Sequence, residues 1–349
     1  MAASGAAGAR ETEPDYATQY VELVRKRIAA DDDVLAAARR RRDRVRKIAE
    51  RFAGARPSYN SGSLAHGTVN DPVKDADCGI VLDRRSWPEL GPDGDGIGPC
   101  GVVKQVAEFV VDKLRDEWPD VSFRISKRAI LFDFAEPIDG QDPSVDLIVG
   151  LTRKDAAGLW IPNTQADSWD ASHPERHTEL LAADPSDLRV VRARIIRLAK
   201  AAIHNDGDDA VLISFNVEAL ALDLVSEVVG IAEGLAVFMA SAADEISADL
   251  TPDPADVSPR IKLPEGITQD AAARRLGYFA THLATAVANR DDREVVLRSL
   301  GAVFGPQLPE ATKDEKDDLA SALLRGVGGV AVTAAFGRPQ QKTTSSYGA

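Results

Sequence analysis

Residues 59–83 decide the fold: the stretch YNSGSLAHGTVNDPVKDADCGIVLD sets a Gly-Ser pair and a Gly-Thr pair ahead of an acidic, otherwise apolar strand. Side chains alternate along a strand, so DADCGIVLD has two faces, one with Asp75, Asp77, Gly79 and Val81 and one with Ala76, Cys78, Ile80 and Leu82. The two carboxylates then lie about 6.6 Å apart on one face. That separation lets them converge on two metal ions roughly 3.5 to 4 Å apart.

Other residues extend this pattern into a site. Gly62 permits close approach of the backbone, and the hydroxyl and amide of Ser63 can bond a terminal phosphate. Asp146, in DPSVDLIVGL, begins a second apolar strand and is the preferred third carboxylate and base for a ribose hydroxyl; Asp133 and Asp142 are weaker candidates. Hard oxygen ligands suit two Mg²⁺ ions, with Mn²⁺ as an alternative. The sequence therefore predicts phosphoryl or nucleotidyl transfer, and an exposed acidic turn is the minority interpretation.

Composition narrows the class of protein. The chain has 349 residues, of which 44% are hydrophobic, and a formal net charge of -13, which argues against general nucleic-acid or anionic-membrane binding. Two cysteines, Cys78 and Cys100, form neither a disulfide framework nor a thiolate metal site. The N-terminal stretch has no secretion signal, and acidic residues interrupt the most apolar segment, residues 219–243. We expect a cytoplasmic protein.

The residue patterns divide the chain into two halves. We expect a disordered leader at residues 1–13, followed by two amphipathic helices and then by strands and loops with one helix over residues 102–114. From about residue 158 the pattern predicts an almost wholly helical segment. The predicted boundaries are 14–155 for an α+β core with N-terminal helices, 156–335 for a helical domain and 336–349 for a flexible tail. The basic run ARRRRDRVRK is interpreted as a solvated helix face rather than a nucleic-acid patch.

Three other motifs have simpler explanations than a binding site. The stretch GDGIGPCG, residues 94–101, imitates a dinucleotide loop but has no strand directly before it, so we expect a flexible surface loop. His173 and His177 have zinc-ligand spacing, but Ser172 and Glu175 form a capping-box pattern that predicts a helix start. Cys78 lies on the strand face opposite the aspartates and is expected in the core.

Gly-Ser followed by Asp-x-Asp on a strand and by a later Asp resembles the DNA polymerase β-like nucleotidyltransferase superfamily. The fuller text, SGSLAHGT and VKDADCGIVL with VDLIVGL, LWIPN, SHPERHTELL and LISFNVEALAL, is similar to the bacterial CD-NTases, relatives of cyclic GMP-AMP synthase, over residues 16–337. This resemblance implies an α+β fold: a nucleotidyltransferase core with a mixed sheet and flanking helices, followed by a helical domain.

The resemblance also assigns roles to residues: metal ligands Asp75, Asp77 and Asp146, phosphate contacts Gly62, Ser63, Lys200 and Ser214, and base contacts Phe215 and Asn163. Each assignment outside the aspartates has a plainer alternative. Lys200 would otherwise be a solvated helix lysine, Phe215 a core aromatic with equal weight, and Asn163 a turn asparagine, which is the stronger alternative at that position.

The implied function is synthesis of a cyclic di- or trinucleotide second messenger from NTPs, with release of pyrophosphate, in anti-phage (CBASS-type) signalling through a downstream effector. Two alternatives stay open: nucleotidyl transfer to a tRNA or protein acceptor, and a non-catalytic nucleotide sensor. The tail ends in Gly348 and Ala349, small enough for a ubiquitin-transferase-like partner to join the terminal carboxylate to target amines. A frayed terminus without a role is the alternative there.

Overall fold

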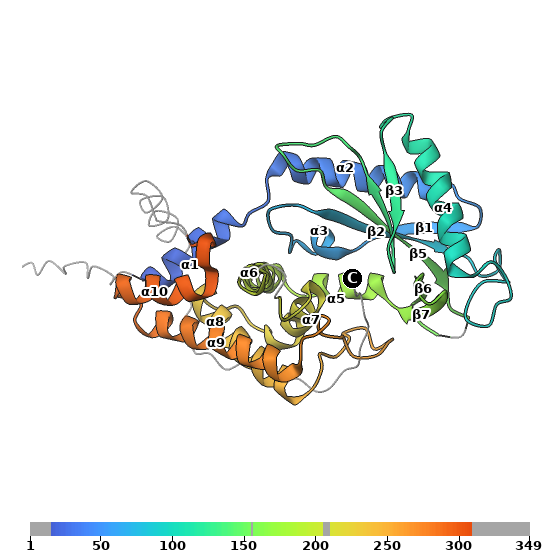
Figure 1. Ribbon diagram of the computed structural model, residues 1–349. Helices are drawn as coiled ribbons and strands as arrows, with labels where there is room; N and C mark the ends of the chain where they lie inside the picture. Colours follow the sequence, from blue (N-terminus) through green and yellow to red (C-terminus); the bar gives the residue numbers. More distant parts are fainter. Residues whose placement is uncertain (1–14, 155, 205–209, 309–349) are drawn as a thin grey trace, which may run out of the picture.

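A seven-stranded mixed sheet forms one half of the protein (Figure 1). The computed structural model describes residues 15–154, 156–204 and 210–308, so the expected leader and the tail with Gly348 and Ala349 lie outside the described residues. The strands are β1 (Ala55–Asn60), β2 (Asp75–Leu82), β3 (Ser122–Ile125), β4 (Ile130–Asp133), β5 (Ser144–Thr152), β6 (Leu159–Asn163) and β7 (Ser168–Ser172). Their order is β1-β2-β5-β4-β3, and a β6–β7 hairpin pairs with the end of β5. Among the strands of the described residues, β2 and β5 alone run parallel, and the other pairs are antiparallel.

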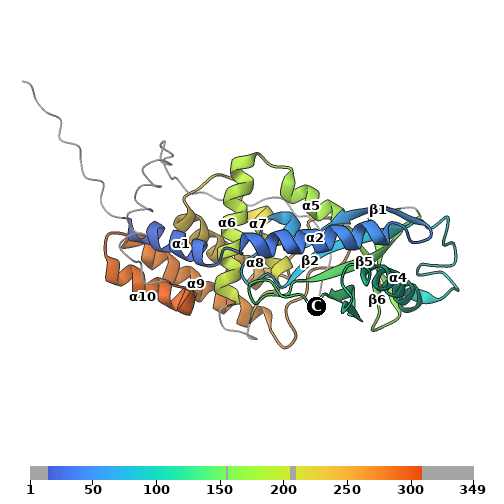
Figure 2. The same ribbon diagram turned by 90° about the horizontal axis from the view of Figure 1, so that it is seen from above.

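Two long helices cover one face of this sheet, as both views show (Figures 1 and 2). They are α2 (Asp32–Ala49) and α4 (Gly98–Leu114), and their apolar sides bury the core-facing residues of β2, namely Ala76, Cys78, Ile80 and Leu82. The predicted alternation along β2 is therefore confirmed, with Cys78 in the core. Burial raises the pKa of the Cys78 thiol, which makes it a poor nucleophile.

The other half is helical and has a separate hydrophobic core. Its helices are α1 (Tyr16–Arg27), α5 (Pro174–Ala182), α6 (Ser186–Ile203), α7 (Ser214–Leu224), α8 (Ile231–Ala248), α9 (Gln269–Ala288) and α10 (Arg293–Phe304), followed by a 3₁₀ turn at Gly305–Gln307. Helices α8 and α9 pack along each other and α10 closes the bundle against α1 (Figure 1). None of the helices in the described part of the chain is long and apolar enough to cross a membrane.

The structure differs from the predicted boundaries in two places. Helix α1 packs in the helical half, not with the sheet, because Tyr20, Val21 and Val24 join the core of that half. The sheet extends past residue 155, to Ser172, because β6 and β7 form a hairpin that the text LWIPN with its Pro162 does not reveal. The half that follows the sheet therefore begins at α5.

Most arginines of the basic run on α2 form ion pairs or hydrogen bonds within the protein. Arg41 is fully buried: its guanidinium donates to Asp142 Oδ1 at 2.7 Å and to the carbonyl oxygens of Pro143 and Glu136. The description as a solvated face is wrong for Arg41, which ties α2 to the loop before β5. Asp142 is thereby occupied as the partner of a buried arginine.

The other two motifs are also settled. Helix α4 begins at Gly98, so only the first half of the stretch 94–101 is a loop. Helix α5 begins at Pro174 with His173 as its N-cap, whose Nδ1 accepts from the amide of Arg176, so the predicted cap at Ser172 is one residue early. His177 contacts Asp253 Oδ1 through Nε2 at 2.6 Å, a pairing that accounts for its position without zinc.

Candidate active site

The parallel pairing of β2 with β5 brings the predicted acidic residues together. In its register Asp77 lies opposite Asp146, and Asp75 lies opposite Ser144. Side chains at paired positions of neighbouring strands point to the same face of a sheet. Asp133, on the neighbouring strand β4, forms an ion pair with Arg124 at 3.3 Å, and its charge contributes least to the raised pKa of Asp146.

The electrostatics of the three carboxylates reflect crowding and burial. Burial, followed by the charges of Asp75 and Asp146, raises the pKa of Asp77 well above its ordinary value. Burial and the nearby Asp75 raise the pKa of Asp146 to about 7. Burial raises the pKa of Asp75 too, and the cations of Lys74 and Lys200 partly offset it. A cation bound between these carboxylates would stabilise their ionised forms.

Gly62 lies directly against one of these carboxylates. It begins the short helix α3 (Gly62–His66), between β1 and β2, with a φ of +69°. A Cβ at this position would overlap the carboxylate of Asp77, so any other residue would displace Asp77 or α3. The group that lies close to the Gly62 backbone is thus a predicted metal ligand, and the predicted phosphate contact of Gly62 stays a prediction.

A cavity of about 500 Å³ opens between the sheet and the helical half. The sheet side contributes Ser61, Gly62, Ser63, Asp75 and Asp77, and the helical side contributes Lys200, Ser214, Phe215 and Glu218. The structure thus brings together seven of the predicted residues from both halves of the chain. Asp146 lies one strand farther away, outside this lining.

Lys200 is bound to acidic and hydroxyl partners that sequence reasoning missed. Its Nζ lies 2.7 Å from Glu218 Oε1 and 3.3 Å from Thr68 Oγ1. Glu218 also accepts from Thr68 at 2.5 Å and contacts His66 Nδ1 at 2.9 Å. Lys200 is only 6% exposed, so the alternative of a solvated helix lysine is wrong. An acidic residue inside the apolar text NVEALAL was the available clue, because buried carboxylates are usually paired.

The two residues predicted to contact a nucleobase, Phe215 and Asn163, lie in different places in the structure. Phe215 lines the cavity, with its ring 4.8 Å from that of His177. Asn163 does not line it: its Nδ2 lies 3.3 Å from Asp170 Oδ2, and its Oδ1 accepts from the amide of Ala166 in the β6–β7 turn. The turn-asparagine interpretation is therefore the one that fits Asn163.

The donor set fits hard divalent cations such as Mg²⁺. The ligands are carboxylate oxygens, and beside them the buried hydroxyl of Ser61, which lines the cavity, has no hydrogen-bond partner among the described residues. A buried polar atom without a partner costs free energy, which a ligand in the cavity would recover. The cavity thus contains both the negative charges of Asp75 and Asp77 and the unsatisfied hydroxyl of Ser61.

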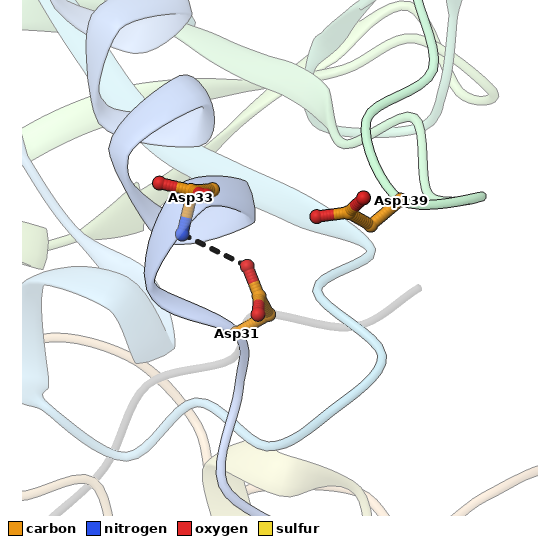
Figure 3. A group of neighbouring side chains, drawn as sticks. All are labelled: Asp31, Asp33 and Asp139. Carbon is orange, nitrogen blue, oxygen red and sulfur yellow. Dashed lines mark hydrogen bonds between the residues drawn. The ribbon is translucent and has the colours of Figure 1, made fainter.

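A different cluster of acidic side chains has the spacing that would let all its members bind one metal ion. Within the described ranges, the three side chains whose ligand atoms all lie within 4.8 Å of one another are Asp31, Asp33 and Asp139, and all three are exposed (Figure 3). Asp31 is the N-cap of α2 and accepts from the amides of Asp33 and Val34. Helix capping accounts for its position, and none of the three residues lines the cavity.

The pKa of Asp146 predicts a pH-dependent stability of the metal-free protein. Its folded-state pKa is about 7 against an ordinary value of 3.8, so the folded state binds the proton more tightly than the unfolded state. The contribution to stability is therefore fully present below the unfolded value and is lost as the pH rises through about 7. With a chelator present, we expect Asp146→Asn to melt several degrees above the wild type at pH 8, as a shift of this size implies.

The matching control is the same pair of proteins at pH 4, where wild-type Asp146 is protonated and the two melting temperatures should nearly coincide. Thermal denaturation followed by circular dichroism measures the difference across this range. A difference that does not grow with pH would mean that Asp146 is not buried among like charges.

Comparisons with known proteins agree with this geometry. No family model matches the sequence, and no curated protein matches it. Among solved structures, the chain is similar to CdnC of Escherichia coli MS115-1 with ATP (16% identity, TM-score 0.61, covering 85% of this chain and 100% of that one). It is also similar to DncV of Vibrio cholerae, a cyclic AMP-GMP synthase, with the linear intermediate 5′ pppA(3′,5′)pG (12%, 0.62, 86% and 98%). A third is the CD-NTase CdnG of Bradyrhizobium diazoefficiens with GTP (16%, 0.56, 82% and 98%).

These likenesses cover both halves of the chain. The protein therefore has a CD-NTase-like fold, and the α+β fold class expected from the sequence is confirmed.

Proposed function

We propose that the protein is a nucleotidyltransferase that joins nucleoside triphosphates into a cyclic di- or trinucleotide and releases pyrophosphate. The observation that carries this proposal is a cavity with carboxylates on the sheet side and Lys200 with Ser214 on the helical side. One side suits metal-bound reacting groups and the other suits a polyphosphate. The ligands of the similar solved structures, ATP, GTP and a linear dinucleotide with a 5′ triphosphate, belong to the same chemical class.

The residues divide the work of this reaction between them. Asp75, Asp77 and Asp146 would hold two Mg²⁺ ions, which when bound polarise the α-phosphate and the attacking hydroxyl. Asp146 accepts the proton of the ribose hydroxyl at a carboxylate oxygen. Ser63 and Ser214 donate their hydroxyls to phosphate oxygens, and Lys200 supplies a cation to the triphosphate. Phe215 offers an aromatic face to a nucleobase.

Such a product would act through a downstream effector, and we propose that the protein serves CBASS-type anti-phage signalling. The same reaction, repeated on the linear product, closes the ring. Conjugation of the C-terminal carboxylate at Ala349 remains a prediction about residues outside the described part of the chain.

Incubation of the purified protein with Mg²⁺ and the four NTPs, singly and together, tests the proposal. We expect phosphatase-resistant products without any added acceptor, identified by mass spectrometry and nuclease mapping. Transfer that needs tRNA or protein would instead identify a macromolecular acceptor. Binding of NTPs with no product would identify a sensor and overturn the proposed reaction.

Lys200→Ala separates binding from chemistry. We expect the NTP concentration for half-maximal rate to rise by at least about tenfold, with a smaller effect on the rate at saturation, because a ground-state contact is lost. The variant should also be less stable, since Glu218 loses its buried counter-charge. Steady-state kinetics at 25 °C on the folded variant measure the split. A collapse of the saturating rate with unchanged apparent affinity would instead assign Lys200 to the transition state.

A further inference from the structure

Glu218 is a buried carboxylate that binds three donors from different parts of the chain. It is 5% exposed, and its partners Thr68 and Lys200 are 1% and 6% exposed. Carboxylate oxygens only accept hydrogen bonds, so the His66 ring carries its proton on Nδ1, the atom that faces Glu218. The contact between the two halves of the protein at this point is therefore a polar cluster around the Glu218 carboxylate, in which Thr68 Oγ1 donates to Glu218 and accepts from Lys200.

Glu218 and two of its partners, His66 and Lys200, lie on the helices that carry the residues assigned to the phosphates. His66 is the last residue of α3, whose first residues are Gly62 and Ser63. Lys200 lies on α6, and Glu218 itself lies one turn after Ser214, the first residue of α7. One side chain thus connects all three helices that carry predicted phosphate contacts. No metal ligand belongs to the cluster.

The cluster also fixes the ammonium group of Lys200. Lysine is among the side chains that lose most rotamer freedom on ordering, and ordering it during ligand binding weakens affinity. Of its three N–H groups, one points to Glu218 and one to Thr68, which leaves the third for the cavity that Lys200 lines. A lysine held in this way is already placed before a ligand arrives.

The charge of Glu218 has a role beyond geometry. Burial by itself would raise the pKa of Glu218, but Lys200 and His66 outweigh it and hold the pKa below its ordinary value, so the group is ionised. The carboxylate is therefore the buried counter-charge of the Lys200 ammonium, 2.7 Å away.

We propose that Glu218 is a positioning residue, which holds Lys200 and α3 in the arrangement that receives the triphosphate of an NTP. This inference rests on the proposed function. Glu218 lines the cavity, but in this proposal it acts on the triphosphate through Lys200. It follows that the effect of losing its charge depends on whether Lys200 is present.

A double-mutant cycle tests this dependence. The probes are the α,β-methylene analogues of ATP and GTP with Mg²⁺, and calorimetry measures their dissociation constants for the wild type, Glu218→Gln, Lys200→Ala and the double variant. Glutamine keeps the shape and one acceptor but removes the charge. We expect Glu218→Gln to weaken binding at least about tenfold in the wild-type background and less than about twofold in the Lys200→Ala background.

Two results would overturn the inference. An equal fold-change in both backgrounds would mean that Glu218 acts independently of Lys200, as a general stabiliser of the fold does. Tighter binding by Glu218→Gln alone would mean that the carboxylate competes with the phosphates for Lys200.

Two further variants keep the test interpretable. Asp184 forms an ion pair with the buried Arg192 in the helical half. Asp184→Asn removes this pair and should lower the melting temperature without weakening binding of the analogues. Glu218→Asp keeps the charge and withdraws it by one methylene, and it replaces Glu218→Gln in the cycle if the latter does not fold. A wild-type protein that neither binds the analogues nor makes product would overturn the proposed function itself, whereas binding with an additive cycle overturns only the role of Glu218.

Discussion

Replacement of both Asp75 and Asp77 by asparagine is expected to reduce product formation from NTPs by at least about a thousandfold, or about 4 kcal/mol of transition-state stabilisation. The amides occupy the same space but lack the charge that holds two divalent ions. Because burial raises the pKa of both carboxyl groups, the ionised side chains destabilise the free protein. The double variant should therefore melt no lower than the wild type at pH 7.5, and unfolding cannot explain the loss.

The control for this experiment is Asp133→Asn on the neighbouring strand β4. It removes one carboxylate of the same sheet, which pairs with the exposed Arg124 and contributes least to the raised pKa of Asp146. It should leave synthesis within about twofold of the wild type, since surface ion pairs contribute little. Quantitative chromatography of the nucleotide products measures all three proteins. Near-normal synthesis by the Asp75 and Asp77 double variant would rule out the metal-dependent mechanism.

Gly62→Ala is expected to lower the rate at saturating NTP by at least about a hundredfold, because a displacement of catalytic groups by 1 Å has effects of this order. The new methyl group would overlap the carboxylate of Asp77, so either that side chain or α3 must move. The substitution changes no charge and no hydrogen-bonding group. Its effect therefore reports geometry alone.

Gly67→Ala is a matched control at the other end of α3. Gly67 has a φ of +71°, almost the same as Gly62, but a Cβ there would meet no atom within 4 Å. Both alanines carry the cost of a left-handed conformation, about 1 to 2 kcal/mol, and only one carries the overlap. Equal losses of activity in the two variants would show that backbone strain, not the contact with Asp77, explains the effect.

Periodicity explains what could be read from the sequence. The alternation in DADCGIVLD fixes which residues of β2 face the core, because a shift by one residue would bury both aspartates of the strand among apolar side chains. Helix α4 was visible from its apolar spacing, although it begins at Gly98 rather than near residue 102. Local patterns of this kind need no knowledge of distant contacts.

The missed features depend on distant contacts. The partners of Glu218 lie 18 to 152 residues away along the chain, so no local pattern contains them. The amphipathic face of α1 shows that the helix packs against something, but not that its partner is the helical half. Likewise, β6 and β7 are short, partly polar strands whose stability comes from their pairing with each other and with β5.

The position of α1 beside α10 has a consequence for the order of events during synthesis. The amide of Tyr16 donates to the carbonyl of Arg290, and Arg293 Nε donates to the hydroxyl of Tyr20, a contact that spans 273 residues. At about 5 to 20 residues per second, a ribosome adds Arg293 roughly 14 to 55 s after Tyr20. During this interval α6 and α8, which also pack against α1, are already made, but the side of α1 that packs against α10 lacks its native partner. The nascent chain therefore completes the contacts of α1 only after α10 has been made, and a chain that stops before α10 leaves part of its first helix exposed to chaperones and proteases.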